Sequence, residues 1–339
     1  MSKLRLGVIG AGMGAKPHGR ALADLRDRVE VTGVFSRTSE RRETFAAEHG
    51  FPVAAVLNDL IDDSDAILLL TPPVARTDIL TACAEAGKHV LCEKPLERTA
   101  EAAGAIVETF DAKGLKLGVV FQHRYRHGSR VLARMIGNGD MGAILAVEAQ
   151  VPWWRDQSYY DEPGRGTYAR DGGGVLISQA IHTLDLMLSL TGPVSEVQAM
   201  TATTGFHQME AEDFAAAALR FANGAVGSII ASTAAYPGGA ESIRLHCAKA
   251  TATLQAGTLR LDWHDRAPEE IGEPATTGGG ADPMAFPHDW HRDLIAGFVD
   301  AVATDRDPVP SGRDALAVQR LIDAMVASSM AGARMTVET

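Results

Sequence analysis

The sequence predicts an α/β protein with two domains: a doubly wound parallel sheet followed by an α+β domain with a mostly antiparallel sheet. Three observations predict this. The chain has 339 residues, which suits about two domains. Apolar runs alternate with helical patterns over the first third of the chain. Beyond about residue 122, strand patterns follow one another through hairpin signals. We therefore expect one domain at residues 1–122 and a second at residues 123–339. In an alternative arrangement, the C-terminal helices pack back on the first domain.

Five runs in the first domain have the pattern of buried strands: residues 4–10, 29–35, 66–70, 88–92 and 116–121. Between them, alanine, leucine and charged residues recur at helical spacing in residues 15–25, 39–49, 74–86 and 99–113. Strands that alternate with helices predict a parallel sheet covered on both faces.

The second domain begins with a long strand pattern at residues 143–151. Asn223-Gly224 joins two further strands and is a strong hairpin signal. Residues 241–261 predict two or three more strands, and residues 175–190, 289–303 and 311–330 have helical patterns. The glycine- and proline-rich residues 272–283 predict a loop.

Composition narrows the possible partners and the compartment. The net charge of -11 disfavours nucleic acid and anionic membrane surfaces. No run of 18 apolar residues predicts a spanning helix, and the first residues predict a strand and a turn rather than a signal peptide. Three cysteines without a CxxC motif favour a reduced, cytoplasmic protein.

A glycine-rich turn follows the first predicted strand. Read as G-x-G-x-x-A, it places Gly10 at the tight turn, Gly12 beside a pyrophosphate and the small Ala15 where helix and strand pack. The start of the next helix would add N–H groups for the phosphates. A turn that binds nothing is the alternative. The expected phosphate-binding residues are Gly10, Ala11, Gly12, Met13 and Gly14.

The end of the second strand predicts which dinucleotide is preferred. Ser36 stands where an acidic residue would bind an adenosine 2′-hydroxyl, and Arg37 follows it. A 2′-phosphate can bind the serine and pair with the arginine, so we expect NADP, with NAD as the alternative. Alternatively, Arg37 is a solvated surface residue or stacks on the adenine ring.

Four motifs in order resemble those of the Gfo/Idh/MocA family of NAD(P)-dependent oxidoreductases. After the glycine turn come Thr71-Pro72-Pro73 and Glu93-Lys94-Pro95, each closing a predicted strand, and then a GGG-x-L-x5-H-x-x-D pattern at residues 172–185. The resemblance covers almost the whole chain. It implies a Rossmann domain, an open second sheet, and a homodimer or homotetramer joined through that sheet. Further cofactor contacts are expected at Thr71, Pro72, Glu93 and Lys94.

The resemblance also implies a reaction. Lys94 and His182 would be the catalytic pair in a cleft between the domains, interconverting a hydroxyl and a carbonyl on a carbohydrate-like small molecule: a sugar, sugar derivative or cyclitol. Histidine suits the proton transfer, and lysine stabilises the developing alkoxide. Alternatives are an NAD-dependent inositol-type dehydrogenase, a redox-driven elimination or glycoside-cleaving enzyme, and a non-catalytic dinucleotide-binding sensor.

The helix predicted at residues 175–190 carries a polar stripe. Ser178, His182 and Asp185 are spaced i, i+4 and i+7, which places them on one face. Many sugar-acting family members have an aspartate where Ser178 stands. Either Asp185 orients His182, then, or Lys94 does most of the proton work. A core histidine with no catalytic role is the alternative for His182.

Substrate contacts are expected in two polar segments and on this helix. The basic segment after the last Rossmann strand and the aromatic segment at residues 151–174 suit hydroxyl-rich or carboxylated ligands, although a solvated basic turn and core packing are the alternatives. The candidates are Arg124, Tyr125, Trp153, Arg155, Tyr160, Arg165, Ser178 and His182. The histidine pairs 123/127 and 288/291 lack a set that completes a metal site, so we expect no metal.

Overall fold

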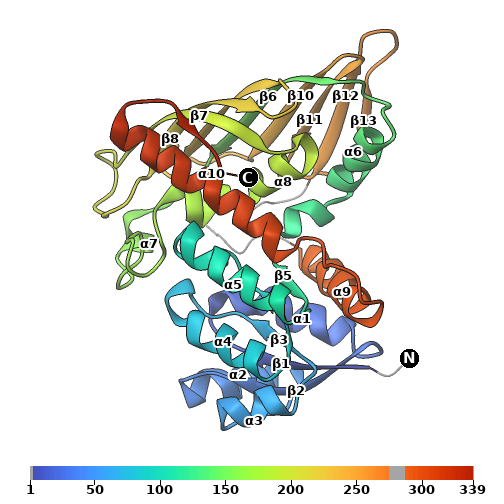
Figure 1. The fold of residues 1–339 in the computed structure, drawn as a ribbon, viewed down its shortest axis with the longest axis vertical. Coiled ribbons are helices and arrows are strands. Elements are labelled where there is room, and N and C mark those ends of the chain that lie inside the picture. The colour runs from blue at the N-terminus through green and yellow to red at the C-terminus, as the bar shows by residue number, and fades with distance from the viewer. Residues whose placement is uncertain (1–2, 275–286, 339) are drawn as a thin grey trace. The chain divides into compact units, whose positions relative to one another are not determined.

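The computed structural model describes residues 3–274 and 287–338 (Figure 1). The chain divides into two compact units, Met1–Gln122 with Pro287–Leu316 and His123–Phe286 with Ala317–Thr339. Most of the loop expected at residues 272–283 lies outside the described residues.

The first unit contains a parallel sheet of five strands. They are β1 (Leu4–Ile9), β2 (Val29–Phe35), β3 (Ala66–Leu69), β4 (His89–Cys92) and β5 (Leu117–Val119), in the order β2-β1-β3-β4-β5. All four residues of β3 are buried, as expected of a strand covered on both faces. The predicted Rossmann-type sheet is confirmed: β2 has the predicted bounds, and the ends of the other strands differ from the prediction by at most two residues.

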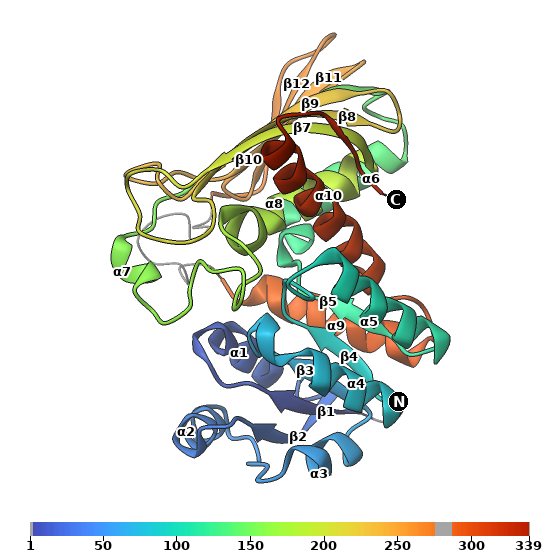
Figure 2. The same cartoon turned by 60° about the vertical axis from the view of Figure 1, so that its left-hand side comes forward.

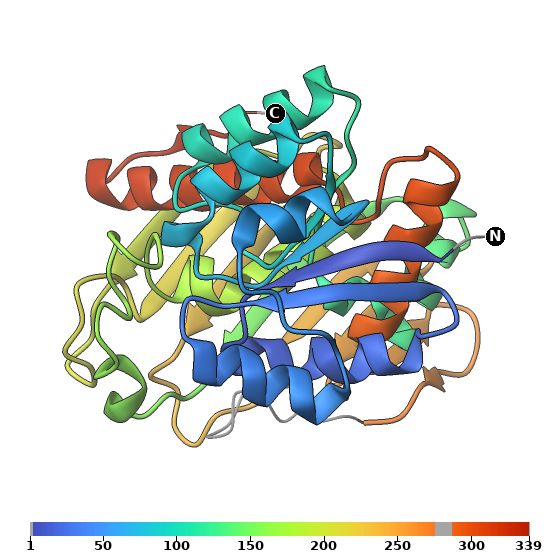
Figure 3. The same cartoon turned by 90° about the horizontal axis from the view of Figure 1, so that it is seen from below.

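Helices cover both faces of this sheet. α1 (Lys16–Asp24) and α9 (Asp289–Ala303) pack together on one face, and α4 (Thr77–Glu85) and α5 (Ala100–Ala112) pack on the other (Figure 3). α2 (Ser39–His49) ends at Gly50, whose φ of 67° is the left-handed conformation typical of a helix end. The six-residue α3 (Leu57–Asp62) was not predicted, because it is too short to show a helical period.

The strand order creates a switch point between β1 and β3. The chain leaves β1 toward β2 on one side and returns to β3 on the other. Ile9 pairs with Leu69, and Leu69 with Cys92, so the turns after these three strands begin at one level of the sheet. Ligands of open parallel sheets bind at such a point.

The second unit contains a mixed, mostly antiparallel sheet of nine strands in the order β13-β12-β11-β10-β6-β9-β8-β7-β14. Only the pairing of β6 with β9 is parallel among the pairings described. The Asn223-Gly224 turn joins β8 to β9 as predicted. The strands are β6 (Ile144–Pro152), β7 (Val194–Ala202), β8 (Phe214–Phe221), β9 (Val226–Ser232), β10 (Ser242–Cys247), β11 (Ala250–Gln255), β12 (Thr258–Trp263), β13 (Glu269–Ile271) and β14 (Met335–Thr336).

One face of this sheet is covered by helices. α6 (His127–Gly137) packs on β11 and β12, and α8 (Ile181–Thr191) packs on β6 and β10 (Figure 2). Alternate residues Val147, Ala149 and Val151 of β6 point into this core and are buried. The remaining helices are the short α7 (Gln157–Tyr160) and the long α10 (Gly312–Ala331). None of the helices in the described part of the chain has the length and apolar character needed to cross a membrane.

Candidate active site

The turn after β1 forms an open cradle. Gly10 has a φ of 110°, and a Cβ there would lie 2.8 Å from the Leu70 carbonyl carbon, so only glycine fits. A Cβ on Gly12 or Gly14 would meet no atom within 4 Å, and both residues are exposed. Ala15 is buried against the sheet. The tight glycine and the small buried residue are packing requirements, whereas the two open glycines leave the backbone accessible to a ligand.

The start of α1 suits an anionic ligand. A 3-10 turn at Met13–Ala15 leads into the helix, whose first turn contains no acidic residue. Its N–H groups and positive dipole end can therefore receive phosphate. At the end of β2, Ser36 is half-buried and Arg37 is exposed. The open glycines and the helix start without acidic residues fit the phosphates of a dinucleotide, and contacts of Ser36 and Arg37 with its adenosine ribose remain predictions.

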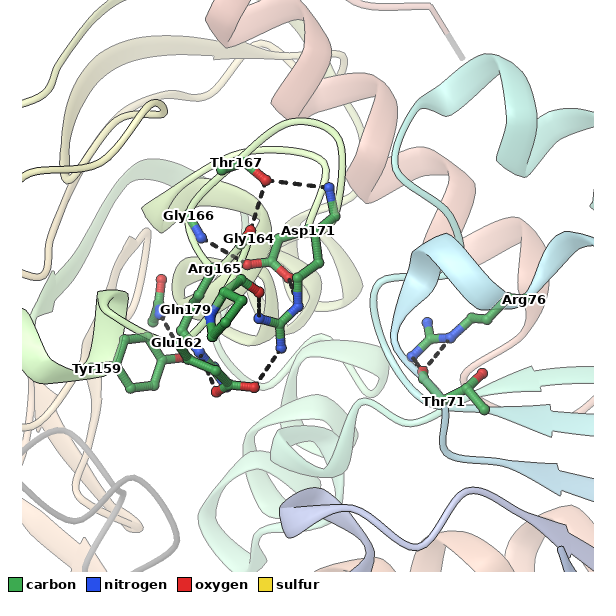
Figure 4. Close-up of polar contacts among 12 residues, drawn as sticks. Thr71, Arg76, Tyr159, Glu162, Gly164, Arg165, Gly166, Thr167, Asp171 and Gln179 are labelled. Carbon is green, nitrogen blue, oxygen red and sulfur yellow. Dashed lines mark hydrogen bonds and ion pairs between the residues drawn. The ribbon is translucent and has the colours of Figure 1, made fainter. Parts of the chain in front are cut away.

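Arg76 ties together the turns that follow β3 and β4. Its buried guanidinium donates through Nε (2.8 Å) and Nη2 (2.5 Å) to the carbonyl oxygen of Thr71, which Figure 4 shows. Its Nη1 donates to the carbonyl of Glu93 (2.5 Å) and to that of Pro95. Arg76 was not among the predicted residues, because nothing local in the sequence marks an arginine that bonds carbonyls 17 and 19 residues away.

Glu93 is held by two groups of its own unit. One oxygen lies 2.8 Å from His18 Nε2, and the other accepts from the Lys94 backbone N–H at 3.0 Å. Burial opposes ionisation, but the hydrogen bond from His18 and the electrostatic effects of His18 and Lys94 outweigh it and lower the pKa of Glu93 to about 2. The carboxylate therefore stays charged beside Lys94. Its role as a cofactor contact remains a prediction.

His18 and His291 complete this cluster and were also missed. Their rings meet edge to face, with centroids 4.8 Å apart, although they come from α1 and α9. Burial and the neighbouring His18 lower the pKa of His291 to about 3, so its ring is neutral. The ligand atoms of His18, Glu93 and His291 lie within 4.8 Å of one another. We interpret the group as His18 hydrogen-bonded to the Glu93 carboxylate beside the neutral ring of His291.

The three glycines at 172–174 allow the backbone to meet Glu212. A Cβ on Gly174 would lie 1.8 Å from the Glu212 carbonyl oxygen, which excludes any side chain. The Glu212 carboxylate accepts from the N–H groups of Gly174 (3.2 Å) and Leu176 (3.0 Å), and its carbonyl accepts from Val175 (2.8 Å). One residue thus satisfies three N–H groups at the start of the helical segment. Burial raises the pKa of Glu212 despite these bonds.

The helical segment differs from the regular helix predicted at residues 175–190. A π-helical turn occupies Leu176–Ala180, and α8 begins only at Ile181. The wider turn moves Ser178 away from the position that a regular i, i+4 spacing with His182 would give it. His182 and Asp185 lie three residues apart within α8. π turns are rare and often occur at functional sites.

Asp185 and Arg124 form a two-point ion pair. The Arg124 side chain donates from Nε (2.8 Å) and Nη2 (2.6 Å) to the two oxygens of Asp185, which is 0% exposed. Such forked pairing fixes both side chains. Arg124 is therefore not a solvated basic residue, and Asp185 is engaged with it. The nearby His182 is 7% exposed, and its ring stacks on His123.

The aromatic segment faces inward in part. Trp153 and Tyr160 are buried, and their polar atoms bond Glu241 (3.2 Å) and Thr233 (2.7 Å). These are core contacts rather than a surface for sugar rings. Arg155 is buried too, with its guanidinium over Trp153.

Arg165 lies at the outer part of this segment. Its guanidinium lies 4.3 Å from the centre of the Tyr159 ring and pairs with Glu162, as Figure 4 shows. Tyr125 and Ser178 are half-buried. Arg165, Tyr125 and Ser178 remain predicted substrate contacts.

The comparisons with known families divide the chain as its two sheets do. Residues 4–121 match the model of an oxidoreductase family with an NAD-binding Rossmann fold. Residues 129–253 match the model of the GFO/IDH/MocA C-terminal domain.

Similar proteins span the whole chain. The WlbA dehydrogenase from Bordetella pertussis, solved in complex with NADH and UDP-GlcNAcA, is 30% identical over 99% of this chain and 98% of its own, with a TM-score of 0.85. An inositol 2-dehydrogenase of Rhizobium meliloti is 27% identical over 96% of both chains. A levoglucosan dehydrogenase of Pseudarthrobacter phenanthrenivorans is 28% identical over 70% of this chain and 69% of its own. The chain belongs to the Gfo/Idh/MocA family and is an NAD(P)-dependent oxidoreductase.

Proposed function

We propose that this enzyme transfers a hydride between nicotinamide and a hydroxyl or carbonyl carbon of a sugar, sugar derivative or cyclitol. The observation that carries the proposal is the pairing of two features at one sheet edge: an open glycine cradle after β1, and a Lys94 turn anchored by Arg76 and Glu93 after β4. The names of the similar proteins, which act on inositol and levoglucosan or bind a nucleotide sugar, support this substrate class.

In the proposed mechanism, the glycine turn after β1 would hold the dinucleotide, whose nicotinamide would supply the hydride chemistry, and the protein's own residues move the proton. His182 takes the proton from the substrate hydroxyl as its carbon is oxidised, and returns one in the reverse direction. The ammonium of Lys94 stabilises the negative charge on that oxygen. Arg124 holds Asp185 on the helix that carries His182.

Substitution of the two proton-transfer residues tests this function. Lys94→Ala and His182→Ala should each lower turnover by on the order of ten-fold or more while folding normally, because each removes a transition-state interaction. The measurement is nicotinamide absorbance with a panel of sugars and cyclitols, beside circular dichroism. Native turnover in both variants, or dinucleotide binding with no turnover on any substrate, would refute the proposal.

We infer that NADP is preferred over NAD. The support is local: no carboxylate stands at Ser36 to repel a 2′-phosphate, and Arg37 is exposed beside it. The WlbA dehydrogenase to which this chain is similar was solved with NADH. A comparison of NADP with NAD as the cofactor of this enzyme therefore tests the inference directly.

The ratio of the two Michaelis constants measures this preference. Arg37→Ala should raise the KM for NADP by about ten-fold and leave the KM for NAD unchanged, since it removes a charged contact to phosphate alone. Arg41→Ala, an exposed arginine of α2, is the matched control. A native enzyme with the lower KM for NAD contradicts the inference.

We also propose a homodimer or homotetramer joined through the face of the nine-stranded sheet that the described part of the chain leaves uncovered. Met200 of β7, Ala216 of β8 and Ile230 of β9 lie side by side in register on that face. Met200 is 68% exposed and Ile230 48%. Neighbouring exposed apolar side chains on a broad sheet are typical of a protein interface.

A further inference from the structure

The ring of His182 lies flat against that of His123. The two centroids are 4.8 Å apart and the ring planes differ by 28°, which is a stacked arrangement. Both histidines are buried. His182 comes from α8, and His123 comes from the 3-10 turn Gln122–Tyr125 that precedes α6. A stacked neighbour restricts the rotation of an imidazole about its χ2 angle, because a turned ring would collide with it.

The protonation of His123 follows from its partner. Its Nε2 lies 2.7 Å from Nη2 of Arg126. A guanidinium nitrogen only donates, so Nε2 must hold a lone pair, and the ring is neutral with its proton on Nδ1. A second proton on His123 would break this bond and place two cations side by side.

Arg126 is itself fixed from behind. Its Nη1 donates to Oε1 of Glu241 at 2.5 Å, and Oε2 of Glu241 accepts from Nε1 of Trp153 at 3.2 Å. All three side chains are buried. The neutral state of His123 therefore rests on a buried chain of three anchored groups, in which arginine and glutamate balance each other's charge.

On this basis we propose that His123 is a positioning residue for His182: held neutral by Arg126, it offers a flat ring that sets the plane in which the His182 imidazole moves its proton. The inference rests on the proposed function of His182. It assigns a role to a residue that the sequence analysis considered only as half of a metal-like pair. Trp153, expected to contact substrate, acts here as the outer anchor of the chain.

Two substitutions of His123 distinguish the effect of its stacked ring from the effect of its Nε2 as an acceptor for Arg126. His123→Phe keeps a flat ring against His182 but removes the acceptor for Arg126. His123→Gln removes the ring and keeps a carbonyl acceptor for Arg126. If the stacked ring positions His182, turnover falls by about ten-fold or more in His123→Gln, with little change in the KM for dinucleotide, and the ring of His123→Phe restores it.

The opposite pattern overturns the inference. Native turnover in His123→Gln, or equal losses in both variants, means that the ring of His123 does not position His182. His49→Gln is the matched control: it removes another buried histidine, stacked on Phe51 at 5.6 Å in the first unit, and should keep native turnover. His182→Ala is measured alongside. If His182→Ala loses turnover while His123→Gln keeps native turnover, this inference alone is overturned. Native turnover in His182→Ala overturns the proposed function as well.

Nitrogen NMR of the native protein with isotope-labelled histidine reports the protonation state of His123 directly. This readout depends neither on enzyme activity nor on whether His123→Phe folds. The signal of His123, assigned by its loss in His123→Gln, should keep the pattern of a neutral ring with a lone pair on Nε2 through the pH range in which an ordinary histidine titrates. A ring that protonates in that range overturns the inference.

Discussion

Single buried residues determine the local chemistry around Lys94. Glu93 is ionised because His18 and the Lys94 backbone bond it, and His291 is neutral because it is buried beside His18. Arg76 fixes the carbonyls on both sides of the lysine. The ammonium that we propose to be catalytic must be held close to one position. These four residues provide the support that an isolated Glu-Lys-Pro motif does not reveal.

The neutral state of His291 predicts a pH dependence of stability. Its pKa is about 3 in the folded protein and 6.5 ordinarily, so between these values the unfolded chain binds a proton that the folded chain does not. Stability is therefore full above pH 6.5 and falls as the pH drops below it, by up to about 1.4 kcal/mol per pH unit. Urea unfolding measured between pH 4.5 and 6.5 tests this. Glu93 adds to this decline only near the lower end of the interval, because its stabilisation is lost as the pH falls through 4.5 toward 2.

The variant His291→Gln isolates the effect. It should show a shallower decline in the free energy of unfolding over this interval. His264→Gln, which replaces an exposed histidine, should keep the slope of the native protein. Equal slopes in all three proteins would contradict the assignment to His291.

At the level of the element, the start of the His182 helix is set by a contact between segments. Glu212, 38 residues from Gly174, supplies the partners for three N–H groups there. The π turn that follows replaces the regular helix that the apolar spacing predicted. Helix periodicity describes one face of a regular element, and a turn of different width changes that face.

Gly174→Ala should damage this element severely. The added Cβ would overlap the Glu212 carbonyl at 1.8 Å, so the backbone must move. We expect a loss of about 2 kcal/mol or more in the free energy of unfolding, with lowered turnover, because His182 follows on the same segment. Thermal unfolding and steady-state kinetics measure both.

Gly137→Ala is the matched control at the end of α6. A Cβ there meets nothing within 4 Å, and the residue is helical. Alanine should leave stability unchanged or raise it by up to about 1 kcal/mol. The contact with Glu212 would be disproved if both variants behaved alike.

On the scale of the whole molecule, the nine-stranded sheet has one face buried under helices and one that residues 3–274 and 287–338 leave uncovered. Residues alternate between these faces along every strand. The uncovered face combines the apolar row Met200, Ala216 and Ile230 with charged side chains such as Arg244 and Glu148. An enzyme whose largest sheet presents such a face can bury it by binding a second copy.

Ile230→Glu should weaken this assembly. A carboxylate in the middle of an apolar contact must lose its water or force the sheets apart. We expect the molar mass from light scattering to shift from oligomer to monomer, with the fold retained. Val56→Glu is the control, since Val56 is 50% exposed but lies in the first unit. A monomeric native protein, or an unchanged oligomer in Ile230→Glu, would exclude this interface.

The sequence by itself determined the features that depend on local periodicity and on short motifs. Alternating strands and helices predicted the Rossmann sheet, the Asn223-Gly224 turn predicted the hairpin of β8 and β9, and the ordered motifs predicted the family. These features are encoded within a few neighbouring residues, so no knowledge of the fold was needed to find them.

Only the tertiary structure showed which side chains meet. The contacts of Arg76 with Thr71 and Glu93, of His18 with Glu93 and His291, of Glu212 with the helix start and of His123 with His182 join segments that are distant in the chain or lie in different elements. It also placed Trp153 and Tyr160 in the core, where the sequence suggested substrate contacts. Buried polar groups need partners, and which partner each one finds depends on how the elements pack, which no local pattern encodes.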